Sequence, residues 1–152
     1  MGGTFLVLGG YGNTGFLIAE LLLQHSDVQI VLAGRSIERA KRSAQALHRK
    51  FQPCRISAIR ADAADPKSLR NAFEQADFVI VASSTSRYVQ RVAEAAIDAG
   101  ADYLDIQLST AAKIDALKAM EEKIEKAGRC FITDGGLIPG VPAVLVRYAA
   151  AQ

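Results

Sequence analysis

A glycine-rich turn near the start of the chain restricts its fold more than any other feature. The turn has the spacing GxGxxG, directly follows the apolar run at residues 4–8, and opens a helical segment at residues 14–25. In such a strand-turn-helix unit the first glycine allows a tight turn, the second lets a diphosphate approach the backbone, and the third lets the helix pack on the strand. The helix N-terminus then faces the anion. These residues are therefore expected to contact a dinucleotide: Gly10, Tyr11, Gly12, Asn13, Thr14 and Gly15. A flexible turn without a ligand is the alternative, and Gly9 is expected to belong to the strand end.

The rest of the chain repeats the alternation of strand and helix. Strand-length runs follow at residues 28–33, 55–59, 78–82, 103–106 and 130–133, and helical segments are expected at 36–51, 65–75, 86–99, 110–127 and 141–151. Parallel strands need crossovers, which are usually helical. The sequence therefore predicts one α/β domain over residues 1–152. Its fold is expected to be a doubly wound Rossmann fold, a parallel sheet of six strands in the order 3-2-1-4-5-6 with helices on both faces. The ligand crevice lies where the order reverses, between strands one and four.

The end of the second strand indicates which dinucleotide is preferred. An NAD site needs a carboxylate here to accept a hydrogen bond from the ribose 2′-hydroxyl, yet no carboxylate occurs from Val28 to Ile37. Arg35 and Ser36 stand there instead, and a guanidinium and a hydroxyl at a helix N-terminus can both donate to a 2′-phosphate. An exposed charge and a plain helix cap are the alternatives. We expect NADP(H) to be preferred, with NAD(H) possible.

Other crevice residues follow the third, fourth and fifth strands. Asp62 and Ala63 are expected beside the adenine, with an Asx turn as the alternative for Asp62. Ser83 and Ser84 are expected along the second ribose or the diphosphate, with a helix-entry loop capped by Ser86 as the alternative. Candidates for a nicotinamide or substrate contact are Asp105 and Gln107, which end the fifth strand. No catalytic residue is assigned, and His25 and His48 are expected on helix surfaces.

Composition excludes several classes of protein. The chain is 50% hydrophobic and 22% charged, with a formal net charge of +2, which is typical of neither a disordered segment nor a coiled coil. We expect no nucleic-acid partner and no membrane span, because the net charge is small and no apolar run is long enough. Cys54 and Cys130 lack a metal-binding spacing, so no metal is expected and Cys130 is expected to be buried. The absence of a secretory signal favours the cytoplasm.

Several motifs together resemble the NADP-binding domain of the saccharopine dehydrogenase (saccharopine reductase-like) family. They are the glycine loop 9–15, Ala33-Gly34-Arg35-Ser36, Asp62-Ala63, Asp102-Tyr103-Leu104-Asp105 and the late glycine-proline loop 135–140. The resemblance covers essentially the whole chain. It implies cofactor roles for Gly10, Gly12, Asn13, Thr14, Gly15, Arg35 and Ser36, and also for Asp62 and Ala63. One departure is that relatives commonly carry a proline after the fourth strand, where this chain has Ser83-Ser84-Thr85.

The resemblance also implies how the domain works. In that family the chain continues into a second domain that holds an amino-acid-derived substrate and often dimerises; that domain is absent here, so this chain is expected to be a fragment. The expected function is the NADP(H)-binding domain of an oxidoreductase acting at a C–N centre, without turnover alone. A small-molecule substrate would bind only through the missing domain, and a homodimer is possible. The alternative is a non-catalytic NADP(H)-sensing or scaffold module. A short-chain reductase is set aside, because no tyrosine is followed four residues later by lysine.

Overall fold

A six-stranded parallel sheet forms the centre of the molecule. The computed structural model describes residues 2–51, 53, 55–135 and 147–150. The strands are β1 (Thr4–Leu8), β2 (Gln29–Gly34), β3 (Ile56–Arg60), β4 (Phe78–Val81), β5 (Asp102–Asp105) and β6 (Phe131–Ile132). They lie in the order β3-β2-β1-β4-β5-β6, and every neighbouring pair is parallel. The predicted doubly wound α/β fold and its strand order are therefore confirmed.

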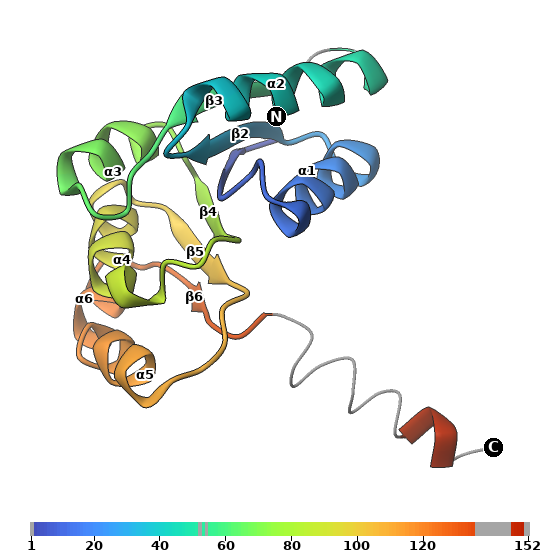
Figure 1. The fold of residues 1–152 in the computed structure, drawn as a ribbon. Coiled ribbons are helices and arrows are strands. Elements are labelled where there is room, and N and C mark those ends of the chain that lie inside the picture. The colour runs from blue at the N-terminus through green and yellow to red at the C-terminus, as the bar shows by residue number, and fades with distance from the viewer. Residues whose placement is uncertain (1, 52, 54, 136–146, 151–152) are drawn as a thin grey trace.

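Helices cover both faces of this sheet. They are α1 (Asn13–His25), α2 (Ile37–Lys50), α3 (Pro66–Phe73), α4 (Val89–Asp98), α5 (Ala111–Lys118) and α6 (Glu121–Lys126). In Figure 1, α1 and α2 lie on one side of the sheet, and α3, α4 and α5 lie on the other. Two of the predicted caps are present, since the side chains of Ser36 and Asp65 accept backbone N–H groups at the starts of α2 and α3.

Alternation along β1 divides the core into two layers. Leu6 and Leu8 point into the layer under α3 and α4, which also contains Phe73. Val7 points into the opposite layer with Leu32, under α1 and α2. Because successive side chains of a strand point to opposite faces, a central strand that is covered twice must be apolar throughout, as the sequence of β1 is.

The structure differs from the sequence prediction at two helices. The single helix predicted over residues 110–127 is wrong, because α5 and α6 are separate. Between them Met120 is buried, and its N–H donates to the carbonyl of Leu117, three residues back, so the turn tightens there. The helix predicted from Ser86 begins with a 3₁₀ turn, η1 (Ser86–Tyr88), and Ser86 lies inside that turn instead of capping it.

Two further expectations concern the C-terminal part of the chain. Cys130 is exposed, so the prediction that it is buried is wrong; it precedes β6, the strand at one edge of the sheet. The late glycine-proline loop at 136–140 lies outside the described residues. Of the helix predicted at 141–151, only residues 147–150 are described, and they are helical.

Candidate functional site

The glycine loop has the strand-turn-helix geometry that the motif predicts. Gly9 has a φ of +90°, a conformation that side chains disfavour, and a Cβ there would lie 2.8 Å from the Ala82 carbonyl oxygen. A Cβ on Gly15 would lie 2.4 Å from the Gly9 carbonyl oxygen, so this residue must be small for α1 to pack against the turn. The sequence reasoning assigned the tight turn to Gly10, but the positive φ belongs to Gly9.

Within the described part of the chain, Gly12 has a single close neighbour where a side chain would stand. A Cβ built there would meet only the Gly9 carbonyl oxygen, at 3.2 Å, among the described atoms within 4 Å. Gly12 donates its own N–H to that carbonyl, and Phe16 donates to the Gly12 carbonyl. The amides of Asn13 and Thr14 lie in the first turn of α1, where no helical carbonyl can accept them. The loop therefore offers backbone donors beside a position with no side chain, as an anion site requires.

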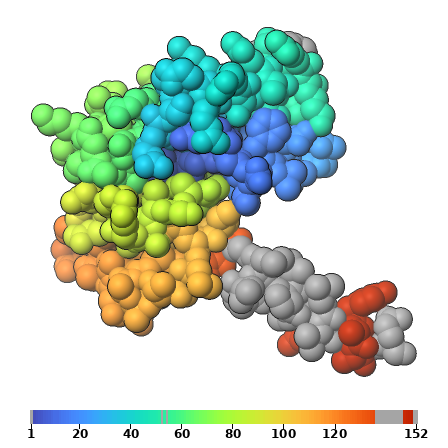
Figure 2. Space-filling view, viewed as in Figure 1, coloured from blue at the N-terminus to red at the C-terminus, as the bar shows by residue number. Residues whose placement is uncertain are grey.

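A pocket of about 460 Å³ opens beside this loop, at the carboxyl ends of the central strands. It lies at the switch point, because β1 has β2 on one side and β4 on the other. Its lining residues are Leu8, Gly9, Tyr11, Gly12, Gly34, Arg35, Ala61, Asp62, Ala63, Ala64, Ala82, Ser83, Ser84, Thr85, Arg87 and Tyr88. In Figure 2 the dark-blue N-terminal residues lie in a hollow between the cyan and the yellow-green segments.

Most of the predicted contact residues line this pocket. Those that do are Tyr11, Gly12, Arg35, Asp62, Ala63, Ser83 and Ser84. Those that are not among its lining residues are Gly10, Asn13, Thr14, Gly15 and Ser36. Gly10 and Gly15 are buried in the packing of the loop itself, whereas Asn13 and Thr14 are exposed in the first turn of α1. The structure thus brings the strand ends together as predicted, and the role of each residue toward a ligand stays a prediction.

The turn after β2 is built around the ring of Tyr11. A Cβ on Gly34 would lie 2.4 Å from the Tyr11 ring, and the Tyr11 hydroxyl accepts the Ser36 N–H at 3.3 Å. The Arg39 guanidinium lies 4.5 Å from the centroid of the same ring. Arg35 is exposed, and no described residue forms an ion pair or hydrogen bond with its guanidinium. Two guanidinium groups therefore flank this corner of the pocket, and the sequence reasoning identified only Arg35.

The Ser36 hydroxyl is already engaged within the turn. It accepts the Arg39 N–H at 3.3 Å and donates to the Glu38 carboxylate at 3.2 Å. The cap that was weighed as the alternative for Ser36 is thus present. Glu38 places a negative charge next to this hydroxyl, just beyond the segment in which the sequence has no carboxylate.

Asp62 also forms the local structure that was its alternative. Its Oδ1 accepts the Ala64 N–H at 3.0 Å in an Asx turn, and its own N–H donates to the Ser68 hydroxyl at 3.0 Å. The turn fixes Asp62 at the pocket wall without using Oδ2. A structural role and a ligand contact are therefore compatible for this residue.

Asp105 does not face the pocket. Its side chain is 0% exposed; Oδ1 accepts from the Lys113 ammonium at 2.9 Å and the Gln107 N–H at 3.0 Å. Oδ2 accepts from the hydroxyls of Tyr103 at 3.0 Å and Thr133 at 2.8 Å. The carboxylate is enclosed by its own network, so the candidate contact with a nicotinamide or substrate is wrong for Asp105 in this conformation.

The charges in this network shift two pKa values. Burial lowers the pKa of Lys113, but hydrogen bonds and attraction to Asp105 and Asp134 outweigh burial and raise it above its ordinary value. Burial, followed by the charge of Asp105, raises the pKa of the Tyr103 hydroxyl well above its ordinary value. Lys113 therefore stays charged and Tyr103 stays neutral at physiological pH.

Several residues of the site escaped the sequence analysis. Arg87 and Tyr88 line the pocket, and the Arg87 guanidinium lies 4.6 Å from the centroid of the Tyr88 ring. The position of Arg87 and Tyr88 shortly after the Ser83-Ser84 loop could have identified them as pocket residues. No comparable signal marks Lys113, which lies in the segment 110–127, where the sequence predicts only a helix.

Two kinds of site are absent from the part of the chain that the structure describes. No group of three or more histidine, cysteine, aspartate and glutamate side chains there is placed to hold a metal ion. None of its helices is both long enough and apolar enough to span a membrane.

Known proteins share this fold and part of this sequence. The oxidoreductase fscI of Fusarium equiseti is 33% identical over 75 residues, which are 49% of this chain and 29% of that protein. The fold matches apo saccharopine dehydrogenase (L-Glu forming) of Saccharomyces cerevisiae with a TM-score of 0.78 and 23% identity, over 97% of this chain and 30% of that one. It also matches an NADPH-dependent quinone oxidoreductase of Escherichia coli, with a TM-score of 0.59 and 19% identity, over 85% of this chain and 46% of that one.

This chain thus spans less than a third of the length of the first two of these proteins. The family model described as the saccharopine dehydrogenase NADP binding domain matches residues 5–132, from β1 to β6. Together with the parallel sheet and the glycine loop at its switch point, this match shows that the chain belongs to the saccharopine dehydrogenase NADP-binding domain family.

Proposed function

We propose that the pocket at the switch point binds NADP(H) in preference to NAD(H). The single observation that carries the preference is the corner after β2. There the Arg35 guanidinium, which has no ion-pair partner among the described residues, stands in the place that an NAD site gives to a carboxylate. Arg39 lies over the Tyr11 ring at the start of α2, within the same corner. A 2′-phosphate there would meet two cations, whereas a 2′-hydroxyl would find no carboxylate at the strand end to accept its proton.

The residues of the pocket suit a dinucleotide. Gly12 leaves room for a diphosphate where a Cβ would otherwise stand, and the first-turn amides of α1 supply donors. The wall after β3 is made of Asp62 and small alanines, which leave space for a flat base. The hydroxyls of Ser83 and Ser84 on the wall after β4 would meet the diphosphate or the second ribose.

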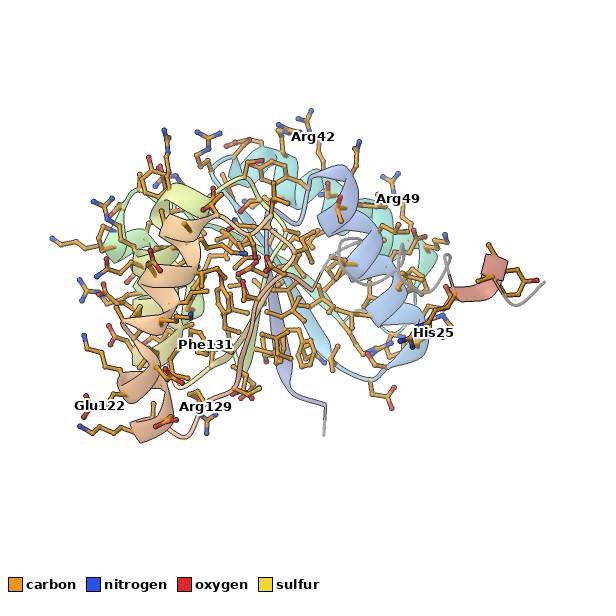
Figure 3. The ribbon with its side chains drawn as sticks, turned by 90° about the horizontal axis from the view of Figure 1, so that it is seen from below. His25, Arg42, Arg49, Glu122, Arg129 and Phe131 are labelled. Atoms are coloured by element: carbon orange, nitrogen blue, oxygen red, sulfur yellow. The ribbon has the colours of Figure 1, made fainter. Side chains whose placement is uncertain are left out.

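The first experiment is a calorimetric titration of the chain with NADPH and NADH. Losing charge-assisted hydrogen bonds to the 2′-phosphate weakens binding by about 1.5–3 kcal/mol, which is about ten- to a hundredfold in affinity. NADPH should therefore bind more tightly than NADH by that factor, and Arg35→Ala should remove most of the difference. Arg49→Ala is the matched control, because Arg49 projects from the distant end of α2 (Figure 3) and should leave both affinities unchanged.

Either of two results would contradict the proposal. Equal affinity of the wild-type chain for NADPH and NADH would contradict the preference, and the pocket would then be a site that binds both dinucleotides alike. Absence of binding by both nucleotides would remove the cofactor assignment for this chain. A third variant sharpens the test: Glu38→Gln removes the charge beside Ser36 and should strengthen binding of NADPH more than of NADH.

The bound cofactor would supply hydride transfer, and this chain would bind and orient it. We further propose that the chain serves an oxidoreductase acting at a C–N centre of an amino-acid-derived substrate, and that it does not turn over alone. Among the described residues the buried carboxylate and ammonium, Asp105 and Lys113, are enclosed in their own network and offer a substrate no acid or base. Substrate-dependent oxidation of NADPH by the 152-residue chain would overturn the proposal that the chain does not turn over alone.

The same enclosure favours one alternative, a non-catalytic module that senses the redox state of NADP(H). A sensor must bind NADPH and NADP⁺ with different affinity and pass the difference to a partner. Titration with both redox forms distinguishes the two functions. Equal affinity would exclude the sensor, and a difference of tenfold or more would favour it over a simple cofactor-binding domain.

A further inference from the structure

The loop Ser83–Thr85, which follows β4, is a thin wall between two hollows. On one side it lines the pocket of about 460 Å³ at the switch point. On the other side, Ser83 and Ser84 line a second hollow of about 400 Å³, together with Gln107 from the segment after β5. The position of this loop therefore decides the shape of the nucleotide pocket on the side away from Arg35.

One side chain from outside the loop holds it. Within the described part of the chain, the side-chain amide of Gln107 is the only such group that forms hydrogen bonds with the loop. Its Nε2 donates to the Ser83 carbonyl at 2.6 Å and to the Thr85 hydroxyl at 3.0 Å. Since the Ser83 carbonyl can only accept, the amide must present its nitrogen to the loop. The buried Oε1 then has no partner among the described atoms.

Gln107 is itself fixed at its backbone. Its N–H donates to Asp105 Oδ1 at 3.0 Å, and its carbonyl accepts from the Lys113 ammonium at 2.9 Å. The ammonium also donates to Asp134 at 2.8 Å, and the Lys113 and Asp105 side chains are both 0% exposed. A buried charged network thus anchors the residue that reaches across to the loop.

The loop in turn touches the glycine turn. A Cβ on Gly9 would lie 2.8 Å from the Ser83 Cβ and from the Ala82 carbonyl oxygen, so the two segments are in direct contact. A shift of the Ser83–Thr85 loop toward the pocket would press on the turn that carries the phosphate-binding amides. A shift away would open the pocket into the second hollow.

We propose that Gln107 is a positioning residue for the nucleotide: its amide holds the Ser83–Thr85 loop against the glycine turn and so shapes the half of the pocket that receives the diphosphate and the second ribose. This inference rests on the proposed binding of NADP(H). The inference goes beyond the proposed function, because it assigns a role to a residue outside the pocket and limits that role to one half of the ligand. The adenine half, at Arg35 and Asp62, lies on the other wall and does not depend on Gln107.

The test compares Gln107→Met with the wild-type chain, using NADPH and adenosine 2′-monophosphate, which lacks the diphosphate, as probes. Methionine keeps the volume and length of glutamine but donates no hydrogen bond. NADPH affinity should fall about five- to tenfold, because two hydrogen bonds that hold the loop are lost, while the monophosphate should bind as in the wild type. Gln90→Met is the matched control and should change neither affinity, because the exposed Gln90 amide donates to Glu94 of the same helix, α4.

Hydrogen exchange gives a readout that needs no ligand. The Thr85 N–H donates to the Ser83 carbonyl at 2.9 Å, and its exchange should accelerate about tenfold in Gln107→Met. Gln107→Glu keeps the shape but turns a carboxylate oxygen toward the Ser83 carbonyl, and should weaken NADPH binding more than methionine does. This second variant serves if the first does not fold.

The outcomes separate the two proposals. If the wild-type chain binds neither probe, the proposed function fails and the positioning role for a nucleotide fails with it. If the wild-type chain binds both probes and the Gln107 variants match it, or if both probes weaken equally, only the positioning role is overturned. Weaker NADPH binding, unchanged binding of adenosine 2′-monophosphate and faster exchange at Thr85 together support the positioning role.

Discussion

The buried Lys113 ammonium donates to three acceptors, and Lys113→Met removes this donor. The acceptors are Asp105 Oδ1 at 2.9 Å, Asp134 Oδ1 at 2.8 Å and the Gln107 carbonyl at 2.9 Å. Without the ammonium, the Asp105 carboxylate is a fully buried charge with no counter-ion. Breaking such a pair costs about 3–5 kcal/mol in the free energy of unfolding. We expect a loss near 3 kcal/mol, because hydroxyl and amide donors still bind Asp105.

Urea denaturation of four chains measures this effect: wild type, Lys113→Met, Asp105→Asn and the double variant. Removing both charges leaves no fully buried ion, since Asp134, which also loses its cation, has a side chain that is 23% exposed. The free energy of unfolding of the double variant should therefore exceed the value expected from adding the two single losses by about 2 kcal/mol or more. Lys126→Met is the control, since Lys126 pairs with Glu122 on the exposed surface of α6. Its free energy of unfolding should change by less than about 0.5 kcal/mol. A loss below about 1 kcal/mol for Lys113→Met, or strict additivity, would refute the reasoning.

Three further predictions concern stability. Gly9→Ala should lower the free energy of unfolding by about 2 kcal/mol or more, and with it the melting temperature. The backbone of Gly9 has a φ of +90°, and the new Cβ would also clash with the Ala82 carbonyl oxygen. An unchanged melting temperature would contradict this. Ser36→Ala removes the cap of α2 and should cost about 1 kcal/mol by urea denaturation, whereas a neutral result would mean that the cap is replaced. The pKa values of Lys113 and Tyr103 are both raised from ordinary values of 10.5 and 10.0. Protonated Lys113 and Tyr103 therefore contribute fully to the free energy of unfolding below about pH 10, and this contribution is lost as the pH rises further. Tyr103→Phe should flatten that alkaline decline in a pH series of urea melts, and an equally steep decline would count against the shifted tyrosine.

The sequence by itself determines the architecture of this domain. Continuous apolar runs such as β1, helical segments capped at Ser36 and Asp65, and the glycine turn between β1 and α1 each follow from local rules of periodicity and backbone freedom. Right-handed crossovers between parallel strands then leave few possible strand orders. The position of the pocket follows, because loops at the carboxyl ends of β1, β2, β3 and β4 must meet at the switch point.

Contacts between residues far apart in the chain were decided only by the tertiary structure. The positive φ of Gly9 reflects the approach of Ala82 and Ser83, and the place of Arg39 reflects the Tyr11 ring beneath it. Lys113 belongs to a charged helical segment, yet its ammonium is buried between two carboxylates. Asp105 ends β5, and Asp134 follows the neighbouring strand β6. Periodicity reports which face of an element is apolar. It carries no information on which polar groups become partners in the folded chain. Here one such contact joins the Gln107 amide to Ser83 and Thr85, which line the pocket at the switch point.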